Sequence, residues 1–536
     1  HSPDTLHFIY FHLWPNAYSD NNTPLAKQLF RMNGKSKLFN DPELKGFIDS
    51  LDFKVNGRLV QWNLLPDQPD ICRVNLNDPL KAGDTIYITT PFHVKIPKGV
   101  TSRLGHIGES YQISQWYPKP AVYDRDGWHP MSYLDQGEFY SEFGSFDVRI
   151  TLPDNYIVGA TGNLQNRQEI EKLEKLAADT SWIHSSHIGK VPFPASSKQI
   201  KTLHYTASEV HDFAWFADKR FNIMKGKVIL PGSGREVTTW VMFTNRQSNL
   251  WKEALNYVNE AILWASKKTG DYPYESFTVA QSPISAGYGM EYPGIALIGI
   301  AEDAYSLDEV LSHEIFHNWF YGALASNERR YPFMDEGITS AYTARYMNEK
   351  YPLKKLWQVY FKDWQLARFL NIDHLPLERM QELEWLIQAR KNLEQPMNLP
   401  ALEYSDLNYG TIIYNKTTIA FNYLRAYLGD SIFDAAMSGY YHNWIFMHPQ
   451  PHDLQAEFEK ITDENLNWFF TDLLGTTKRL DYKMLRIKNN QLLIKNMGEL
   501  VSPLIIAGMN EDSILFERWI DGFAGKKWIP LPDGDY

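Results

Sequence analysis

The sequence predicts a multidomain α+β protein. We expect an all-β N-terminal domain over residues 1–222, a mixed α/β domain over residues 223–475 that runs into helices, and a short β segment over residues 476–536. The short segment is interpreted as a small sandwich or the remaining part of one. Two observations predict this multidomain architecture. The chain has 536 residues, more than a single hydrophobic core usually serves. Its apolar pattern also changes from two-residue alternation to helical periodicity and then back.

The first domain is predicted from short alternating runs. FKVNGRLVQW, DTIYITTPFHV, FDVRITLP and YIVGATGNL are rich in β-branched and aromatic residues, and Gly, Pro, Asp and Asn separate them. Such runs are typical of strands with one buried face. The region therefore indicates an all-β domain.

The second domain is predicted from a helical repeat. In NLWKEALNYVNEAILWASKK, apolar residues such as Leu255, Val258 and Ile262 recur at helical spacings. The strand-like runs FTVAQSP and IALIGI follow, and the chain then reads as mostly helical. The tail YKMLRIKNNQLLIKNMGELVSPLIIAGM returns to alternation around an Asn-Asn turn.

Composition excludes several classes of protein. The net charge is −11 and no long Lys/Arg run occurs, which argues against a nucleic-acid or anionic-membrane partner. A lone cysteine, Cys72, cannot form an internal disulfide. No apolar window is long enough for a membrane span, so we expect a soluble protein. The chain starts at His1 without a signal-like segment, and a secreted or periplasmic protein with its signal removed is one of several open compartments.

The stretch HEIFHNWFYGALASNERRYPFMDEG predicts a metal site. His313 and His317 are four residues apart, so on a helix both imidazoles lie on one face and reach one ion. Glu314 lies beside them and suits a general base. A catalytic zinc needs a third protein ligand, and Glu336, nineteen residues after His317, opens a helix-like run. The alternative is a core helix whose histidines bond to carbonyls.

These residues resemble a known signature. HEIFHNW, an eighteen-residue spacing and Glu336-Gly337 are similar to the zinc motif of the aminopeptidase N-like gluzincin family. The resemblance implies a saddle-like N-terminal β-domain and a thermolysin-like zinc catalytic domain. It also implies one Zn²⁺ per chain, held by His313, His317 and Glu336, and peptide substrates with a free N-terminus. The oligomeric state stays open.

A second motif resembles the exopeptidase strand of that family. ISAGYGMEYPGIALIG is similar to G-x-M-E-N, with Tyr292 in place of Asn. The resemblance implies that Glu291 pairs with the α-amine of the substrate. It also implies that Tyr288, Gly289 and Met290 lie along the peptide. A carboxylate at this place would select a cationic N-terminus.

Two further segments resemble the family. In YSDLNYGTIIYNKTTIAFNYL, Tyr414 matches the tyrosine of Y-x-K-G that stabilises the oxyanion, and Tyr409 matches another tyrosine near the site. SQWYPKPAVYDRDGWH is similar to the N-domain segment that reaches the site. Gln115 and Tyr117 are the predicted substrate-binding residues there. Two residues after Gln115 the family often has Glu or Gln, whereas this chain has Tyr117, so Glu291 is expected to be the main amine anchor.

The sequence predicts a zinc aminopeptidase that cleaves the first peptide bond with a metal-activated water. Three alternatives stay open: a thermolysin-type endopeptidase, a non-catalytic peptide-binding scaffold on the same fold, and an additional epoxide-hydrolase activity. A local cluster of histidines in a loop-like stretch is interpreted as structural, and its members are His442, His448 and His452.

Overall fold

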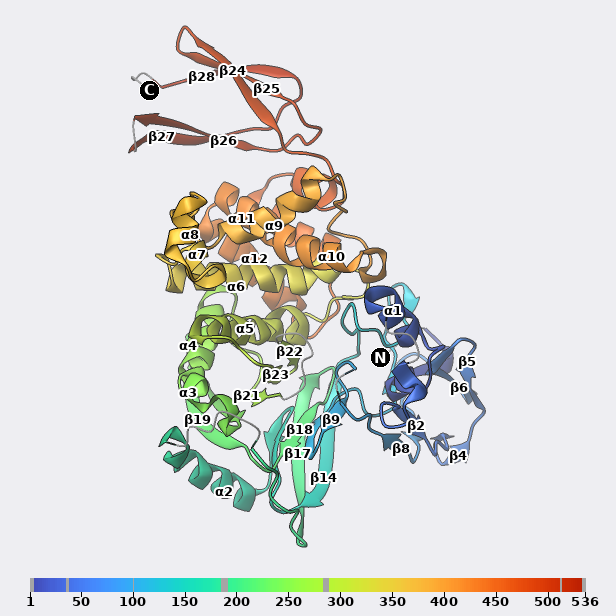
Figure 1. Ribbon diagram of the computed structural model, residues 1–536. Coiled ribbons are helices and arrows are strands. Elements are labelled where there is room, and N and C mark those ends of the chain that lie inside the picture. The colour runs from blue at the N-terminus through green and yellow to red at the C-terminus, as the bar shows by residue number, and fades with distance from the viewer. Residues whose placement is uncertain are drawn as a thin grey trace. The chain divides into compact units, whose positions relative to one another are not determined.

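The structure is a computed structural model of the chain. It describes residues 4–34, 38–99, 101–184, 191–282, 289–510 and 513–532. The chain divides into two compact units, one of His1–Arg329 with Trp444–Pro449 and one of Arg330–Asn443 with Gln450–Tyr536. Figure 1 shows the helices and strands of both units.

Short, mostly antiparallel strands make up the N-terminal part of the first unit. The main sheets have the strand orders β11-β1-β6-β5, β15-β18-β10-β9 and β14-β17-β16. The strands are β1 (Leu6–His12), β2 (Phe47–Asp49), β3 (Lys54–Val55), β4 (Arg58–Leu59), β5 (Trp62–Leu65), β6 (Gln68–Leu80), β7 (Ile88–Thr89), β8 (His93–Lys95), β9 (Gly105–Ile107), β10 (Ser110–Ile113), β11 (Lys119–Pro120), β12 (Tyr123–Asp124), β13 (Gly127–Trp128), β14 (Gly144–Pro153), β15 (Ile157–Ala160), β16 (Asn163–Leu164), β17 (Ile200–Val210) and β18 (Trp215–Asp218). Alternate residues of β17, among them Leu203 and Tyr205, are buried, as expected for a strand with one face on a core.

A five-stranded sheet forms the rest of this unit, with the order β19-β20-β21-β23-β22. The strands are β19 (Asn222–Ile229), β20 (Glu236–Phe243), β21 (Ser276–Gln281), β22 (Gly289–Tyr292) and β23 (Ile295–Ile298). Strands β20, β21 and β23 are parallel, whereas β22 runs antiparallel to β23 at the edge. The central strands β21 and β23 are almost wholly buried, which explains their continuous apolar sequences.

Helices of the first unit pack on these sheets. They are α1 (Pro24–Asn33), α2 (Arg167–Ala178), α3 (Ser248–Trp251), α4 (Ala254–Lys268) and α5 (Ala304–His317), and α5 runs into a π-helical turn, η5 (Asn318–Ala323). The predicted helical repeat forms α3 and α4, with Val258 and Ile262 fully buried. Met290 and Tyr292 of β22 share one core with Ile113 and Phe216 of the N-terminal strands.

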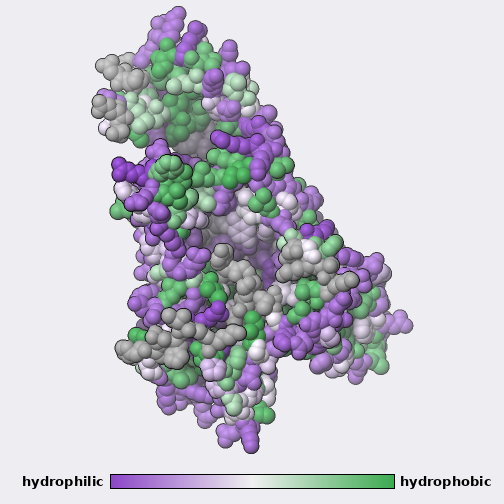
Figure 2. Space-filling model, in the orientation of Figure 1, coloured by the Kyte–Doolittle hydropathy of each residue, from purple (hydrophilic) through white to green (hydrophobic). Residues whose placement is uncertain are grey.

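The second unit is helical and ends in strands. Its helices are α6 (Glu336–Lys350), α7 (Leu356–Tyr360), α8 (Trp364–Phe369), α9 (Arg379–Arg390), α10 (Asp406–Asn408), η8 (Tyr409–Lys416), α11 (Thr417–Leu428), α12 (Asp430–Trp444), α13 (Pro451–Thr462) and η9 (Trp468–Leu473). Helix α6 packs against α11 and η8 and is buried over most of its length. Helices α7 to α9 expose large apolar side chains such as Phe369 and Ile387, and Figure 2 shows hydrophobic residues gathered there.

The C-terminal segment forms strands, as its sequence predicted. They are β24 (Tyr482–Lys488), β25 (Gln491–Asn496), β26 (Leu504–Asn510), β27 (Ser513–Ile520) and β28 (Lys526–Pro530). Asn489 and Asn490 have φ angles of 50° and 56° in the turn between β24 and β25. Two consecutive positive φ angles are the geometry of a type I′ hairpin, which Asn tolerates well. The predicted Asn-Asn turn is therefore confirmed.

The predicted fold class is confirmed: a β-rich N-terminal region, a mixed region that runs into helices, and C-terminal strands follow one another. The three-domain division at residues 222 and 475 stays a prediction. Within the described part of the chain, no helix combines the length and the apolar character that crossing a membrane would take.

Candidate metal centre

Helix α5 presents two histidines one turn apart. Its start is defined by a capping box in which Asp303 accepts a hydrogen bond from the Ser306 amide at 2.9 Å and the Ser306 hydroxyl accepts one from the Asp303 amide at 3.0 Å. The Nε2 atoms of His313 and His317 lie 3.1 Å apart. Two nitrogens on one tetrahedral zinc ion would lie about 3.3 Å apart. The pair therefore fits two ligands of a single metal ion.

Two buried carboxylates lie beside this pair. One ligand atom each of Glu291, Glu314 and His317 lie within 4.8 Å of one another. A Cβ atom at position 289 would overlap the Glu314 side chain, so this carboxylate lies directly against the backbone of β22 at Gly289. The predicted general base and the predicted amine anchor thus lie together in the first unit. Tyr288 lies outside the described residues.

Further charged residues surround Glu291, and no sequence motif indicated them. Carboxylate oxygens of Glu138 and Glu328 lie within 4.8 Å of that of Glu291 and of each other. Arg103 forms a buried ion pair with Glu138, and its Nε donates to the sulfur of Met290 at 3.0 Å. Met290 is therefore buried beside these charged side chains, and its contact with a substrate stays a prediction.

Gln115 and Tyr117 both contact Asp212, a residue that the sequence did not single out. Their side chains donate to its carboxylate at 3.2 Å and 3.1 Å, and Lys119 forms an ion pair with it at 2.7 Å. Burial lowers the pKa of Lys119, and the charge of Asp212 acts in the opposite direction. Burial and the same charge raise the pKa of Tyr117 well above its usual value. Gln115 and Tyr117 are predicted substrate-binding residues, and their contact with a substrate stays a prediction.

Glu336, the predicted third ligand, belongs to the second unit. It is the first residue of α6, is buried, and accepts a hydrogen bond from the Tyr414 hydroxyl at 2.5 Å. Tyr414 lies in η8, whose first residue, Tyr409, has its ring 6.1 Å from the Tyr414 ring. A Cβ atom at Gly337 would overlap Thr417, so α6 and α11 pack closely here. The predicted ligand and the predicted oxyanion donor are therefore direct neighbours.

The three histidines of the local cluster contact other protein groups. The Nδ1 atom of His448 lies 2.8 Å from the Ala325 carbonyl oxygen, and its Nε2 lies 3.1 Å from Glu142. His442 lies on α12 with its Nδ1 2.8 Å from the Ser438 carbonyl oxygen. The Nε2 atom of His452 lies 3.2 Å from the Asp453 carboxylate. These contacts agree with the structural interpretation.

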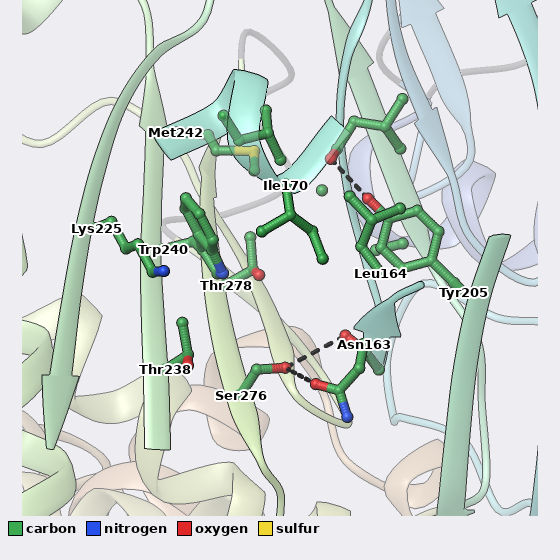
Figure 3. A pocket seen from close by; sticks show the side chains of 15 residues that line it. Asn163, Leu164, Ile170, Tyr205, Lys225, Thr238, Trp240, Met242, Ser276 and Thr278 are labelled. Atoms are coloured by element: carbon green, nitrogen blue, oxygen red, sulfur yellow. Dashed lines mark hydrogen bonds between the residues drawn. The ribbon is translucent and has the colours of Figure 1, made fainter. Parts of the chain in front are cut away.

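A cavity of about 160 Å³ in the first unit is separate from these residues (Figure 3). It lies between β15, β16, α2 and the five-stranded sheet, and its labelled side chains include Lys225, Trp240 and Thr278. Ser276 donates to Asn163 across one end at 2.8 Å. None of the predicted metal or substrate residues lines it.

Residues 254–473 match the model of the peptidase family M1 domain. This part of the chain resembles an M1 peptidase domain. The match contains His313, His317, Glu336 and Tyr414, and it confirms the resemblance inferred from the HEIFH motif.

Two curated proteins resemble part of the chain. Aminopeptidase 2 of Candida albicans is 21% identical over 220 residues, which are 38% of this chain and 22% of that protein. Alanine/arginine aminopeptidase of Saccharomyces cerevisiae is 22% identical over 185 residues, 34% of this chain and 19% of that protein. The matches thus span about a fifth of the length of either relative.

Solved structures resemble nearly the whole chain in fold. The M1 zinc metallopeptidase of Deinococcus radiodurans matches with a TM-score of 0.52 and 14% identity over 88% of this chain and 86% of that chain. Legionella pneumophila aminopeptidase A, solved with aspartic acid, matches with a TM-score of 0.59 and 14% identity over 90% of this chain and 52% of that chain. These likenesses extend the shared architecture beyond the M1 domain to the N-terminal sheets.

Proposed function

We propose that this chain is a zinc aminopeptidase, which hydrolyses the first peptide bond of peptides. The observation that carries the proposal is the group formed by Glu291, Glu314 and His317 within 4.8 Å. It places a carboxylate suited to an α-ammonium group beside the HEIFH motif of an M1 domain. The curated relatives are named aminopeptidases, which supports the same activity.

His313, His317 and Glu336 are the residues that would hold zinc, one ion per chain. Two imidazoles and a carboxylate are a donor set that catalytic zinc uses, and the 3.1 Å separation of the imidazole nitrogens suits it. When bound, zinc supplies a Lewis acid that lowers the pKa of water and polarises a carbonyl group. The names of the zinc metallopeptidases that share the fold support this choice of metal.

Glu314 is the general base in this proposal. It takes a proton from the attacking water and delivers a proton to the leaving amine. Its carboxylate is almost fully buried and lies against the backbone at Gly289, so packing defines its position. A base held in one place meets the geometric demand of proton transfer.

Glu291 binds the α-ammonium group and thereby limits cleavage to the first bond. Its carboxylate lies close to Glu314, so an amine bound there would leave the next carbonyl group near the base. Backbone atoms around Gly289 are proposed to lie along the peptide, because β22 is an edge strand. Gln115 is proposed as a second amine contact.

Tyr414 stabilises the oxyanion in this proposal, and Tyr409 packs near it. The Tyr414 hydroxyl already donates to Glu336, so it lies at the carboxylate proposed to bind zinc. A phenol is protonated at neutral pH and can donate to a developing negative charge.

The alternative is a thermolysin-type endopeptidase in which Glu291 is structural. The other alternative is a peptide-binding scaffold without catalysis. The proposal is tested with a panel of fluorogenic aminoacyl substrates, assayed with and without chelator, together with metal analysis of the purified protein. We expect chelator-sensitive hydrolysis and about one zinc per chain. Absence of hydrolysis from zinc-loaded protein would refute the aminopeptidase and leave the endopeptidase and the scaffold.

A further inference from the structure

The carboxylate of Asp212 is the centre of a buried hydrogen-bond network in the first unit. It has no exposed surface. Its Oδ2 accepts from Lys119 at 2.7 Å and from Gln115 Nε2 at 3.2 Å, and its Oδ1 accepts from the Tyr117 hydroxyl at 3.1 Å and from the Phe213 amide at 2.7 Å. Four donors therefore converge on one carboxylate, which can only accept.

The network determines which way the Gln115 amide faces. Because Asp212 only accepts, Gln115 must turn its NH₂ group toward it, and its carbonyl oxygen then faces away. That oxygen is buried and accepts no hydrogen bond from any residue that the structure describes. A buried carbonyl oxygen left without a donor is costly in a folded protein.

The backbone of Gln115 is also in an uncommon conformation. Its φ angle is 48°, in the left-handed region that residues other than glycine seldom adopt. Strain of this kind persists where the surrounding structure imposes it and is found often at ligand sites. Together, a strained backbone and a buried acceptor without a donor indicate that Gln115 receives a ligand's hydrogen bond.

Gln115 is connected to the strand that carries Glu291. It follows β10, which pairs with β18, and Phe216 of β18 packs against Tyr292 with ring centroids 5.9 Å apart. Tyr292 directly follows Glu291 in β22. Burial raises the pKa of Tyr292 well above its usual value, and the charge of Asp212 is among the nearby groups that act on it.

Tyr117 is bound to the same network. Its hydroxyl donates to Asp212, and its ring packs edge-on against Trp116 and Phe146 at centroid distances of 5.3 Å and 5.7 Å. The hydroxyl at the position where the family often has Glu or Gln is therefore used inside the protein. The Gln115 oxygen, in contrast, is an acceptor that no described residue occupies.

We propose that Asp212 is a positioning residue that holds the Gln115 amide with its oxygen directed at the α-ammonium group of the peptide substrate. The inference rests on the proposed aminopeptidase function. It assigns to Asp212 a part in substrate affinity although Asp212 itself does not contact the substrate.

The first test is Asp212→Asn, which is isosteric. An amide at position 212 can donate to Gln115, so Gln115 can flip and turn its oxygen toward that amide instead of toward the substrate. Loss of a hydrogen bond to a charged group corresponds to about a 10-fold to 100-fold loss of affinity. We expect KM for the best aminoacyl substrate to rise by that factor with kcat within about threefold of wild type.

The second test is the double variant Asp212→Asn, Gln115→Glu, in which the carboxylate and the amide change places between the two positions. The amide introduced at position 212 then donates to one oxygen of the carboxylate introduced at position 115, and the other oxygen of that carboxylate faces the ammonium group. The net charge of the pair is unchanged, and we expect KM to return to within about threefold of wild type. If Asp212 only neutralises Lys119, thermal stability should recover in the double variant while KM does not. Failure of KM to recover would overturn the proposal even if the single variant folds poorly.

The matched control is Glu169→Gln, which weakens another largely buried ion pair of the same unit, with Lys201. It should lower thermal stability without changing KM. Calorimetric binding of the free amino acid that corresponds to the best substrate provides a second readout, in which wild type and the exchange variant should bind more tightly than Asp212→Asn.

The outcomes separate the two proposals. If the wild-type enzyme hydrolyses the substrates and Asp212→Asn has the same KM, the positioning role is refuted and the aminopeptidase stands. If wild type neither hydrolyses aminoacyl substrates nor binds the free amino acid, the proposed function is refuted, and the role of Asp212 is refuted with it.

Discussion

The close contact between Gly289 and Glu314 gives a quantitative prediction. Alanine at position 289 would place its Cβ atom 2.5 Å from Cδ and 2.6 Å from Cγ of Glu314. Ordinary carbon–carbon contacts begin near about 3.5 Å. The Glu314 carboxylate must therefore move by about 1 Å, or the edge strand β22 must move instead.

A shift of this size should reduce catalysis strongly. Displacing a catalytic group by about 1 Å can cost about 100-fold in rate. We therefore expect Gly289→Ala to lower kcat about 100-fold. Zinc content should be unchanged, because the substitution touches none of the proposed ligands.

Steady-state kinetics with a fluorogenic aminoacyl substrate measures the effect. The matched control is Gly144→Ala, since a Cβ atom at that strand position has no heavy atom within 4 Å. The control should keep wild-type kcat. A Gly289→Ala enzyme with kcat within about threefold of wild type would refute the packing argument, and so would loss of zinc.

Three further predictions follow from the same structure. Glu314→Gln should keep zinc bound while kcat falls by about 100-fold or more, and near-normal turnover by the zinc-loaded variant would contradict its role as the base. Tyr414→Phe should lower kcat by about 100-fold if the phenol stabilises the oxyanion, with zinc content measured in parallel. The third prediction concerns stability. Burial raises the pKa of Asp70 to about 6, so the folded state binds its proton more tightly than the unfolded chain does. The free energy of unfolding should therefore fall as the pH rises from about 4 to about 6, by up to about 3 kcal/mol from this group. Asp70→Asn should remove this part of the pH dependence in denaturant unfolding curves, and an unchanged slope would contradict the assignment.

Local patterns predicted the elements that carry the site. The four-residue spacing of His313 and His317 requires only helical geometry, and α5 provides it with the two nitrogens 3.1 Å apart. The turn at Asn489 and Asn490 follows from the tolerance of Asn for positive φ angles. Both features depend on residues that are close in sequence.

Contacts between distant segments could not be predicted in this way. Asp212 lies ninety-seven residues from Gln115, and Arg103 lies 187 residues from Met290, so no local periodicity connects them. Glu328 lies inside the stretch that the sequence singled out, yet its nearness to Glu291 depends on how the chain turns after α5. Tyr117 was predicted as a substrate-binding residue from its position alone, and only its hydrogen bond to Asp212 shows what its hydroxyl does.

The most direct measurement compares one peptide in two forms, with a free and with an acetylated N-terminus, in the wild-type enzyme and in Glu291→Ala. The account predicts rapid, chelator-sensitive removal of the first residue from the free peptide and almost none from the acetylated peptide. It predicts that Glu291→Ala loses about 10-fold to 100-fold in kcat/KM on the free peptide. Equal wild-type rates on the two peptides would contradict the account and indicate an endopeptidase.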